Sequence, residues 1–168
     1  MNSLHIARGF TLLETLIAVV LVGFAFLATA GLHIRSLRDT QQSAQEVAAA
    51  QLADDMYARL RVSSPLQLTS SLQSAGTATP NCYNAVGCTA VEMAADEVKK
   101  WKDSIALRLP GGGGTVCRDS APGDGTPTND NCTAAAGDPV VIKLWWPILQ
   151  NSTTVNYRQF FLYYVPKT

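Results

Sequence analysis

The N-terminal third of the chain carries two hydrophobic patterns in succession. From Leu16 to Ala28 no side chain is polar, and the apolar stretch covers residues 10–32 when Thr29 is included in it. A helix needs about 20 such residues to span a bilayer. The pattern therefore predicts a membrane-spanning helix, and Glu14 is the only charged residue within it.

Beyond residue 32 the pattern changes to a helical repeat with one apolar side. Polar and charged side chains separate its apolar positions, which are Leu37, Ala44, Ala48, Leu52, Met56 and Leu60. We expect the helix to continue to Val62 with this face on a globular domain, and to end before Pro65. Gly23 and Gly31 each weaken a helix by about 1 kcal/mol relative to alanine, which favours bending or local melting.

A second amphipathic helix is predicted in the following part of the chain. Residues 89–92, Thr-Ala-Val-Glu, have the capping-box sequence with which many helices begin. The apolar positions of the helical repeat that follows are Met93, Val98, Trp101, Ile105 and Leu109. Pro110 and Gly111 are expected to end this helix.

The C-terminal part predicts strands. Residues 115–117 are strand-like, and residues 140–146 and 155–165 are dense in β-branched and aromatic side chains, which predicts an antiparallel hairpin. We expect seven aromatic side chains to pack within the sheet and on the first helix. They are Trp145, Trp146, Tyr157, Phe160, Phe161, Tyr163 and Tyr164. The expected fold class is α+β, a long N-terminal helix packed on a small antiparallel sheet with a second helix.

Residues 119–139 lack apolar periodicity and are rich in turn-forming residues, so they predict a loop. Their spacing is not that of an EF-hand, and a solvated loop is favoured over a calcium site. The oxygen ligands that calcium would use there are Asp124, Asn129, Asp130 and Asn131. The glycines at 111–114 lack the Gly-Lys-Ser/Thr ending of a phosphate loop and predict a turn.

Composition narrows the classes of function. The chain has 168 residues, of which 47% are hydrophobic and 15% charged, which suits one membrane segment and one modest domain. Thirteen basic residues balance thirteen acidic ones, so no nucleic-acid partner is expected. No nucleophile, base and orienting group form a catalytic motif, so we expect neither an enzyme nor a cofactor or metal site.

The four cysteines, Cys82, Cys88, Cys117 and Cys132, all follow the apolar segment. Their spacings of six and fifteen residues do not match a redox or zinc CxxC pair. An even number suits an oxidising compartment, and local pairing of Cys82 with Cys88 and of Cys117 with Cys132 is favoured among three connectivities. Four buried thiols are the alternative.

A carboxylate inside a spanning helix costs a few kcal/mol, so Glu14 indicates a functional site. A plain anchor accounts for the length of the segment but not for Glu14. A secretory signal peptide is a second interpretation, because Ala28-Thr29-Ala30 matches the small-residue cleavage pattern. The mature protein would then begin at Gly31, without Glu14 or an anchor.

A third interpretation uses the residues before Glu14. Gly9 and Phe10, followed four residues later by Glu14, resemble the processing site of type IV prepilins and pseudopilins. The resemblance implies a type IV pilin fold, cleavage between Gly9 and Phe10 by a prepilin peptidase, and N-methylation of Phe10. It also implies a leader over residues 1–9, a transmembrane and filament-core helix over 10–32, and a periplasmic domain over 33–168.

The chemistry of the motif gives Glu14 a role. Cleavage would create an ammonium group at Phe10, and Glu14 of an incoming subunit could neutralise the Phe10 amine of a neighbour. A buried carboxylate that is matched to a cation loses most of its desolvation penalty. Glu14 is therefore expected to act in subunit docking and register.

Later segments are similar to PilV-type minor pilins, also called type IV pilus modification proteins. These segments are residues 50–56, 98–102, 109–112, 116–117 and 145–146. The resemblance implies a low-abundance subunit that joins other minor pilins, the major pilin and a tip adhesin, first in the bacterial inner membrane and then in the pilus. Many major pilins have a proline near the position of Gly31, and this chain has none there. The alternatives are a minor pseudopilin of a type II secretion system and, in a different class, a periplasmic binding module cleaved after Ala30.

Overall fold

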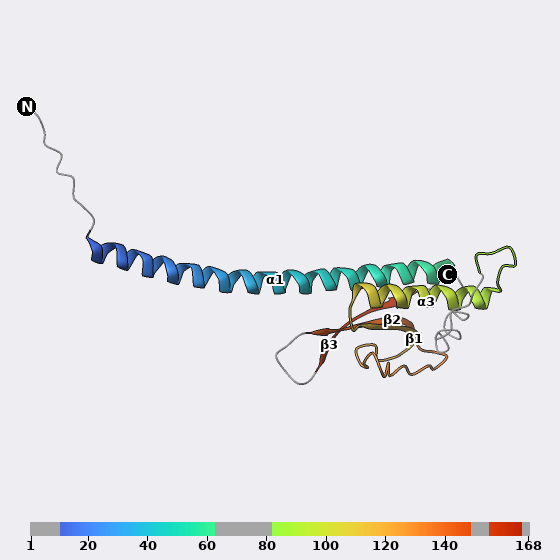
Figure 1. Ribbon diagram of the computed structural model, residues 1–168. Helices are drawn as coiled ribbons and strands as arrows, with labels where there is room; N and C mark the ends of the chain where they lie inside the picture. The colour runs from blue at the N-terminus through green and yellow to red at the C-terminus, as the bar shows by residue number, and fades with distance from the viewer. Residues whose placement is uncertain (1–10, 63–81, 149–154, 166–168) are drawn as a thin grey trace, which may run out of the picture. The chain divides into compact units, whose positions relative to one another are not determined.

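The computed structural model of the chain describes residues 11–62, 82–148 and 155–165. Two helices and three strands lie within these ranges (Figure 1). They are α1 (Leu12–Val62), α3 (Ala90–Arg108), β1 (Gly113–Arg118), β2 (Val140–Ile148) and β3 (Asn156–Tyr164). The chain divides into two compact units, Met1–Ser43 and Ala44–Thr168, which we describe separately.

The first unit consists, in its described part, of the N-terminal half of α1. The helix is continuous through Gly23 and Gly31 in the single chain. Each glycine costs about 1 kcal/mol, which the helical hydrogen bonds on both sides outweigh here. A window of 18 residues has a mean hydropathy of 2.4 and is not buried, so by length and composition α1 can cross a membrane.

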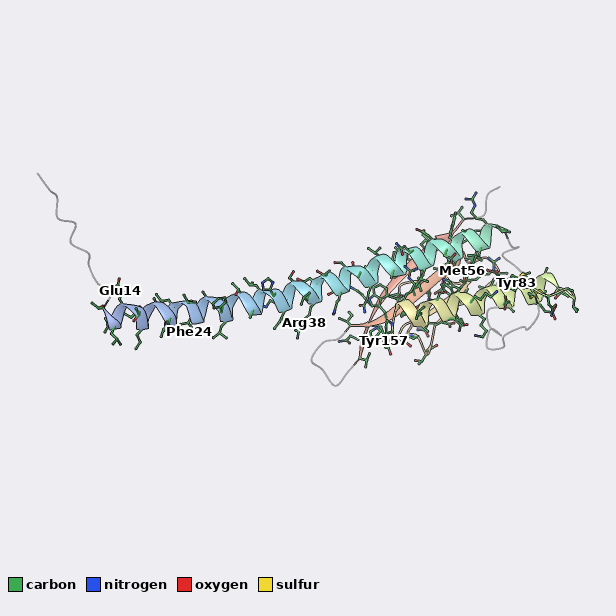
Figure 2. All side chains as sticks on the ribbon, turned by 45° about the horizontal axis from the view of Figure 1, so that its top comes forward. Glu14, Phe24, Arg38, Met56, Tyr83 and Tyr157 are labelled. Carbon is green, nitrogen blue, oxygen red and sulfur yellow. A yellow bond between two sulfur atoms is a disulfide. The ribbon has the colours of Figure 1, made fainter. Side chains whose placement is uncertain are left out.

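The described residues of the second unit form one hydrophobic core between two helices and one face of the sheet. The C-terminal part of α1 contributes Ala49, Leu52, Ala53, Met56 and Leu60, all of them buried. Met56 points from α1 toward α3 and the strands (Figure 2). Predicted face residues Leu37 and Ala44 are exposed, and burial begins only near Ala48. A helical repeat tells which residues share a side of the helix, but not where the partner surface starts.

Helix α3 begins at the predicted capping box. The Thr89 hydroxyl accepts a hydrogen bond from the Glu92 N–H at 3.3 Å, and the Glu92 carboxylate accepts one from the Thr89 N–H at 2.8 Å. The Thr89 N–H and the Thr89 hydroxyl, which donates to the same carboxylate at 2.9 Å, hold the pKa of Glu92 below its ordinary value. The buried side of α3 consists of Ala94, Asp96, Val98, Trp101 and Ile105.

The sheet is antiparallel, with strand order β1-β2-β3. The pairing of β2 with β3 confirms the predicted hairpin. Thr115 lies opposite Lys143, and Lys143 opposite Phe161, so these residues share the outer face. Pro147, expected in the connection between the strands, is part of β2. It lies beyond Trp145, the last residue of β2 that pairs with β1, so its missing N–H removes no bond on that side.

The alternation of side chains divides the predicted aromatic group between the two faces. Trp146, Phe160 and Tyr164 pack in the core with the helices. Trp145 is buried but lies on the outer face, in register with Gly113. Three others on that face are partly exposed, in contrast to the predicted packing: Tyr157, Phe161 and Tyr163.

Replacing Gly114 with alanine is expected to destabilise the second unit. A Cβ at this position would lie 2.5 Å from Ile105 Cδ1 and 2.7 Å from Trp101 Cη2, both in the buried side of α3. Overpacking of this kind costs about 1–3 kcal/mol. Urea denaturation of the full chain should show the loss for Gly114→Ala. Gly137→Ala is the matched control, because no atom lies within 4 Å of its Cβ position; equal midpoints for the two variants would contradict this packing.

Candidate functional site

The residues predicted from the N-terminal motif lie at the start of the chain. Gly9 and Phe10 are outside the described residues. Glu14 is in the first turn of α1 and is exposed (Figure 2). Its backbone N–H donates to the Thr11 hydroxyl at 3.3 Å and to the Thr11 carbonyl at 3.0 Å. A carboxylate in this first turn also interacts favourably with the helix dipole.

All four cysteines form disulfides in the structure. Cys82 is bonded to Cys88 and Cys117 to Cys132, with Cα atoms 4.7 Å and 6.1 Å apart, inside the usual range for disulfides. These are the two local pairs that the sequence spacing favoured. Each bond closes a short ring, and each ring is fixed to a different part of the second unit.

The ring closed by Cys82 and Cys88 is held against α3. The Tyr83 hydroxyl donates to Glu97 at 3.2 Å, and the Lys100 ammonium lies 3.7 Å from the centre of the Tyr83 ring. Thr89, the capping residue of α3, follows Cys88 directly. The disulfide therefore constrains the chain at the point where α3 begins.

The ring closed by Cys117 and Cys132 lies over a buried lysine on the outer face of β2. The Lys143 side chain is fully buried, and its ammonium is in contact with the carboxylate of Asp119. Lys143 Nζ also donates to Asp124 Oδ1 and to the Asp130 carbonyl, each at 3.0 Å. A buried charge needs such partners, since an unpaired one costs several kcal/mol.

The electrostatics of Asp119 follow from this arrangement. Burial alone would raise the pKa of Asp119, but the Lys143 ammonium and the N–H of Ala121 together lower it below its ordinary value. Asp124, considered as a calcium ligand, instead pairs with Lys143. Within residues 11–62, 82–148 and 155–165, no three His, Cys, Asp or Glu side chains are grouped so as to hold a metal ion.

Sequence reasoning missed Lys143, although a signal was present. It is the one charged residue in the apolar run of residues 140–146. A charge within a strand whose other side chains are all apolar indicates a buried partner. The sequence could not tell which of the nearby acidic residues this partner is, because that depends on the path of residues 119–139.

Replacing Lys143 with methionine is expected to lower the stability of the second unit by about 3–5 kcal/mol, because Asp119 would be left as a buried, uncompensated charge. Thermal unfolding of the full chain in detergent measures the effect. Lys99→Met is the control, since Lys99 pairs at 2.7 Å with an exposed partner, Asp103. A surface pair of this kind contributes about 0–1 kcal/mol. We call Lys143, Asp119, Asp124 and the Asp130 carbonyl the Lys143 cluster. A similar change in both variants would show that this cluster is not a stabilising centre.

Comparison with known proteins identifies the N-terminal region. Residues 5–30 match the family model of the prokaryotic N-terminal methylation motif. This match includes Gly9, Phe10 and Glu14. No curated protein and no solved structure matches the chain.

The motif indicates a type IV pilin-like or pseudopilin-like protein, a class that is structural rather than catalytic. The long apolar helix, second helix, three-stranded antiparallel sheet and disulfides are consistent with the type IV pilin-like α+β fold. Motif and helix together suggest a membrane-anchored chain with a globular domain, and they imply a prepilin peptidase and other pilins as partners.

Proposed function

We propose that the chain is a minor pilin that takes part in type IV pilus assembly. The observation that carries the proposal is the methylation motif at residues 5–30, at the start of a helix whose apolar part is exposed. Such a surface is stable in a bilayer or in the interior of a filament, but not in water. The disulfide-bonded second unit suits the oxidising periplasm.

In this proposal the chain is processed before it is assembled. The prepilin peptidase cuts between Gly9 and Phe10 and methylates the new amine. Residues 10–32 then span the bacterial inner membrane, with residues 33–168 in the periplasm. On assembly, the same apolar segment moves from lipid into the core of the pilus.

Glu14 is proposed to set the register of docking. Its side chain is exposed in the first turn of α1, four positions after the proposed new N-terminus at Phe10. A carboxylate in hydrocarbon is costly, and a methylated ammonium group from a neighbouring subunit would offset that cost. This charge match favours one position of the incoming helix over others.

The minor-pilin assignment rests on the segments that resemble PilV-type proteins. In the structure they belong to α1, α3, the turn after α3, β1 and β2, all within the second unit. We propose that this unit joins other minor pilins in a priming complex at the pilus tip, together with the major pilin and a tip adhesin. Because pseudopilins share the methylation motif, loss of pili rather than loss of protein secretion on gene deletion supports this assignment.

Processing of the leader can be tested at the mature N-terminus. Mass spectrometry of the protein isolated from its native membrane should find N-methylphenylalanine at Phe10 and no residues 1–9. A Gly9→Leu variant should keep its leader, because the peptidase recognises the glycine. An unmodified N-terminus at Gly31 would instead identify a secreted protein and remove the proposed role.

The docking role of Glu14 can be tested by removing the charge of its side chain. Glu14→Gln removes the charge and nearly keeps the volume, so cleavage at Gly9 should continue while incorporation into pili falls about tenfold, as a lost buried ion pair allows. Immunoblots of sheared pili, compared with the membrane fraction, measure this ratio.

The control for Glu14 is Asp39→Asn. Asp39 is an exposed acid on the same helix but lies beyond the apolar segment. This variant should be incorporated like the unmodified chain. Normal incorporation of Glu14→Gln would exclude a docking role for the carboxylate.

A further inference from the structure

The Lys143 cluster places an amine against a carboxyl group in a site that is closed to water. The side chains of Lys143 and Asp119 are both fully buried and in contact. A second carboxylate, that of Asp124, accepts a hydrogen bond from Lys143 Nζ at 3.0 Å, and its side chain is 46% exposed. The cluster thus combines a nucleophile, an electrophile and an acid that can exchange protons with solvent.

The two carboxylate oxygens of Asp119 have different surroundings. Oδ1 accepts a hydrogen bond from the Ala121 N–H at 3.0 Å. Oδ2 lies against Lys143 Nζ, so it is the oxygen next to the amine.

We propose that Lys143 and Asp119 condense into an intramolecular isopeptide bond once the second unit has folded. The new bond joins Lys143 Nζ to Asp119 Cγ, and the bond from Cγ to Oδ2 breaks. Oδ2 leaves as water, and Oδ1 becomes the amide oxygen. The inference does not depend on the proposed role in pili.

The protons of the ammonium group balance the reaction. An ammonium has no lone pair and a carboxylate is not an electrophile, so one proton must first pass from Lys143 to Oδ2 of Asp119, with which it is in contact. The neutral amine then attacks Cγ of Asp119, and charge develops on Oδ1, where the Ala121 N–H stabilises it. Asp124, which accepts a hydrogen bond from Lys143 Nζ, takes a second proton from the nitrogen and returns it to Oδ2 as that oxygen leaves. One of the three ammonium protons stays on the amide nitrogen and two leave with Oδ2. Asp124 ends as the carboxylate it was at the start, and no other reactant is needed.

Burial favours the amide in two ways. Two charges in a dry interior carry a desolvation penalty that a neutral amide does not. The fold also holds the reacting groups together, and such intramolecular reactions proceed as if the partner were extremely concentrated. Before condensation Lys143 and Asp119 form an ion pair. The reaction requires a neutral amine and a neutral carboxylic acid, which are a minor form of this pair, so it is expected to be slow.

The test uses the full chain, purified in detergent and analysed by mass spectrometry with its disulfides reduced. The intact protein should be lighter than its sequence by one water molecule. In an unlinked chain, trypsin cuts after Arg118 and Lys143 and releases residues 119–143. Because trypsin does not cut at a lysine whose amine is acylated, the linked chain should give residues 119–158, also one water lighter. Full mass with complete cleavage after Lys143 would overturn the proposal.

Three variants separate the reaction from other losses of water. Lys143→Arg keeps the positive charge without a primary amine and should show the full mass. Asp124→Ala should lower the linked fraction at a fixed time after synthesis by about tenfold or more, because the proton acceptor is gone. Asp103→Asn, an exposed acid on α3, should have no effect.

A cyclic imide at Asp124-Gly125 would also remove one water. Such an imide does not modify Lys143, so trypsin still cuts after it. Hydroxylamine opens the imide but does not open an isopeptide. A loss of water that disappears with hydroxylamine would therefore count against the bond between Lys143 and Asp119.

Discussion

The second unit depends on the packing of one side chain, Trp101. It is fully buried, and its indole N–H donates to the Leu52 carbonyl of α1 at 2.8 Å. The other end of the ring approaches β1 so closely that only glycine fits at position 114. A single residue of α3 thus fixes the spacing of both helices and the sheet, because an indole of this size leaves no room for another arrangement.

Much of this architecture could be predicted from local pattern. The capping box located the start of α3, and the apolar repeat with the residues before Pro65 located the end of α1 at Val62. Both signals are local, since they depend on hydrogen bonds and side chains within one helix. The dense strand pattern likewise predicted the pairing of β2 with β3.

Predictions failed where the answer depended on distant partners. Leu37 has the right position in the helical repeat, but exposure depends on where the globular unit starts. Tyr157 has a strand-like context, but its face of β3 is only partly covered. Lys143 was missed for the same reason, because its partners come from a loop without periodicity. The N-terminal motif was found because it is a short local sequence, and Gly9 and Phe10 needed no fold to be recognised.

Besides its disulfide and its ion pairs with Lys143, the loop over β2 is held by four hydrogen bonds that its backbone carbonyls accept. Gln159 donates to the carbonyls of Pro122 and Asp124, Lys143 donates to that of Asp130, and Arg118 donates to that of Asp138. A carbonyl is present whatever side chain a residue carries. Side chains of residues 120–138 other than Asp124 and Cys132, which pair with Lys143 and Cys117, can therefore change in evolution while these carbonyl contacts remain, so a protein with this design can vary its surface without redesigning its core.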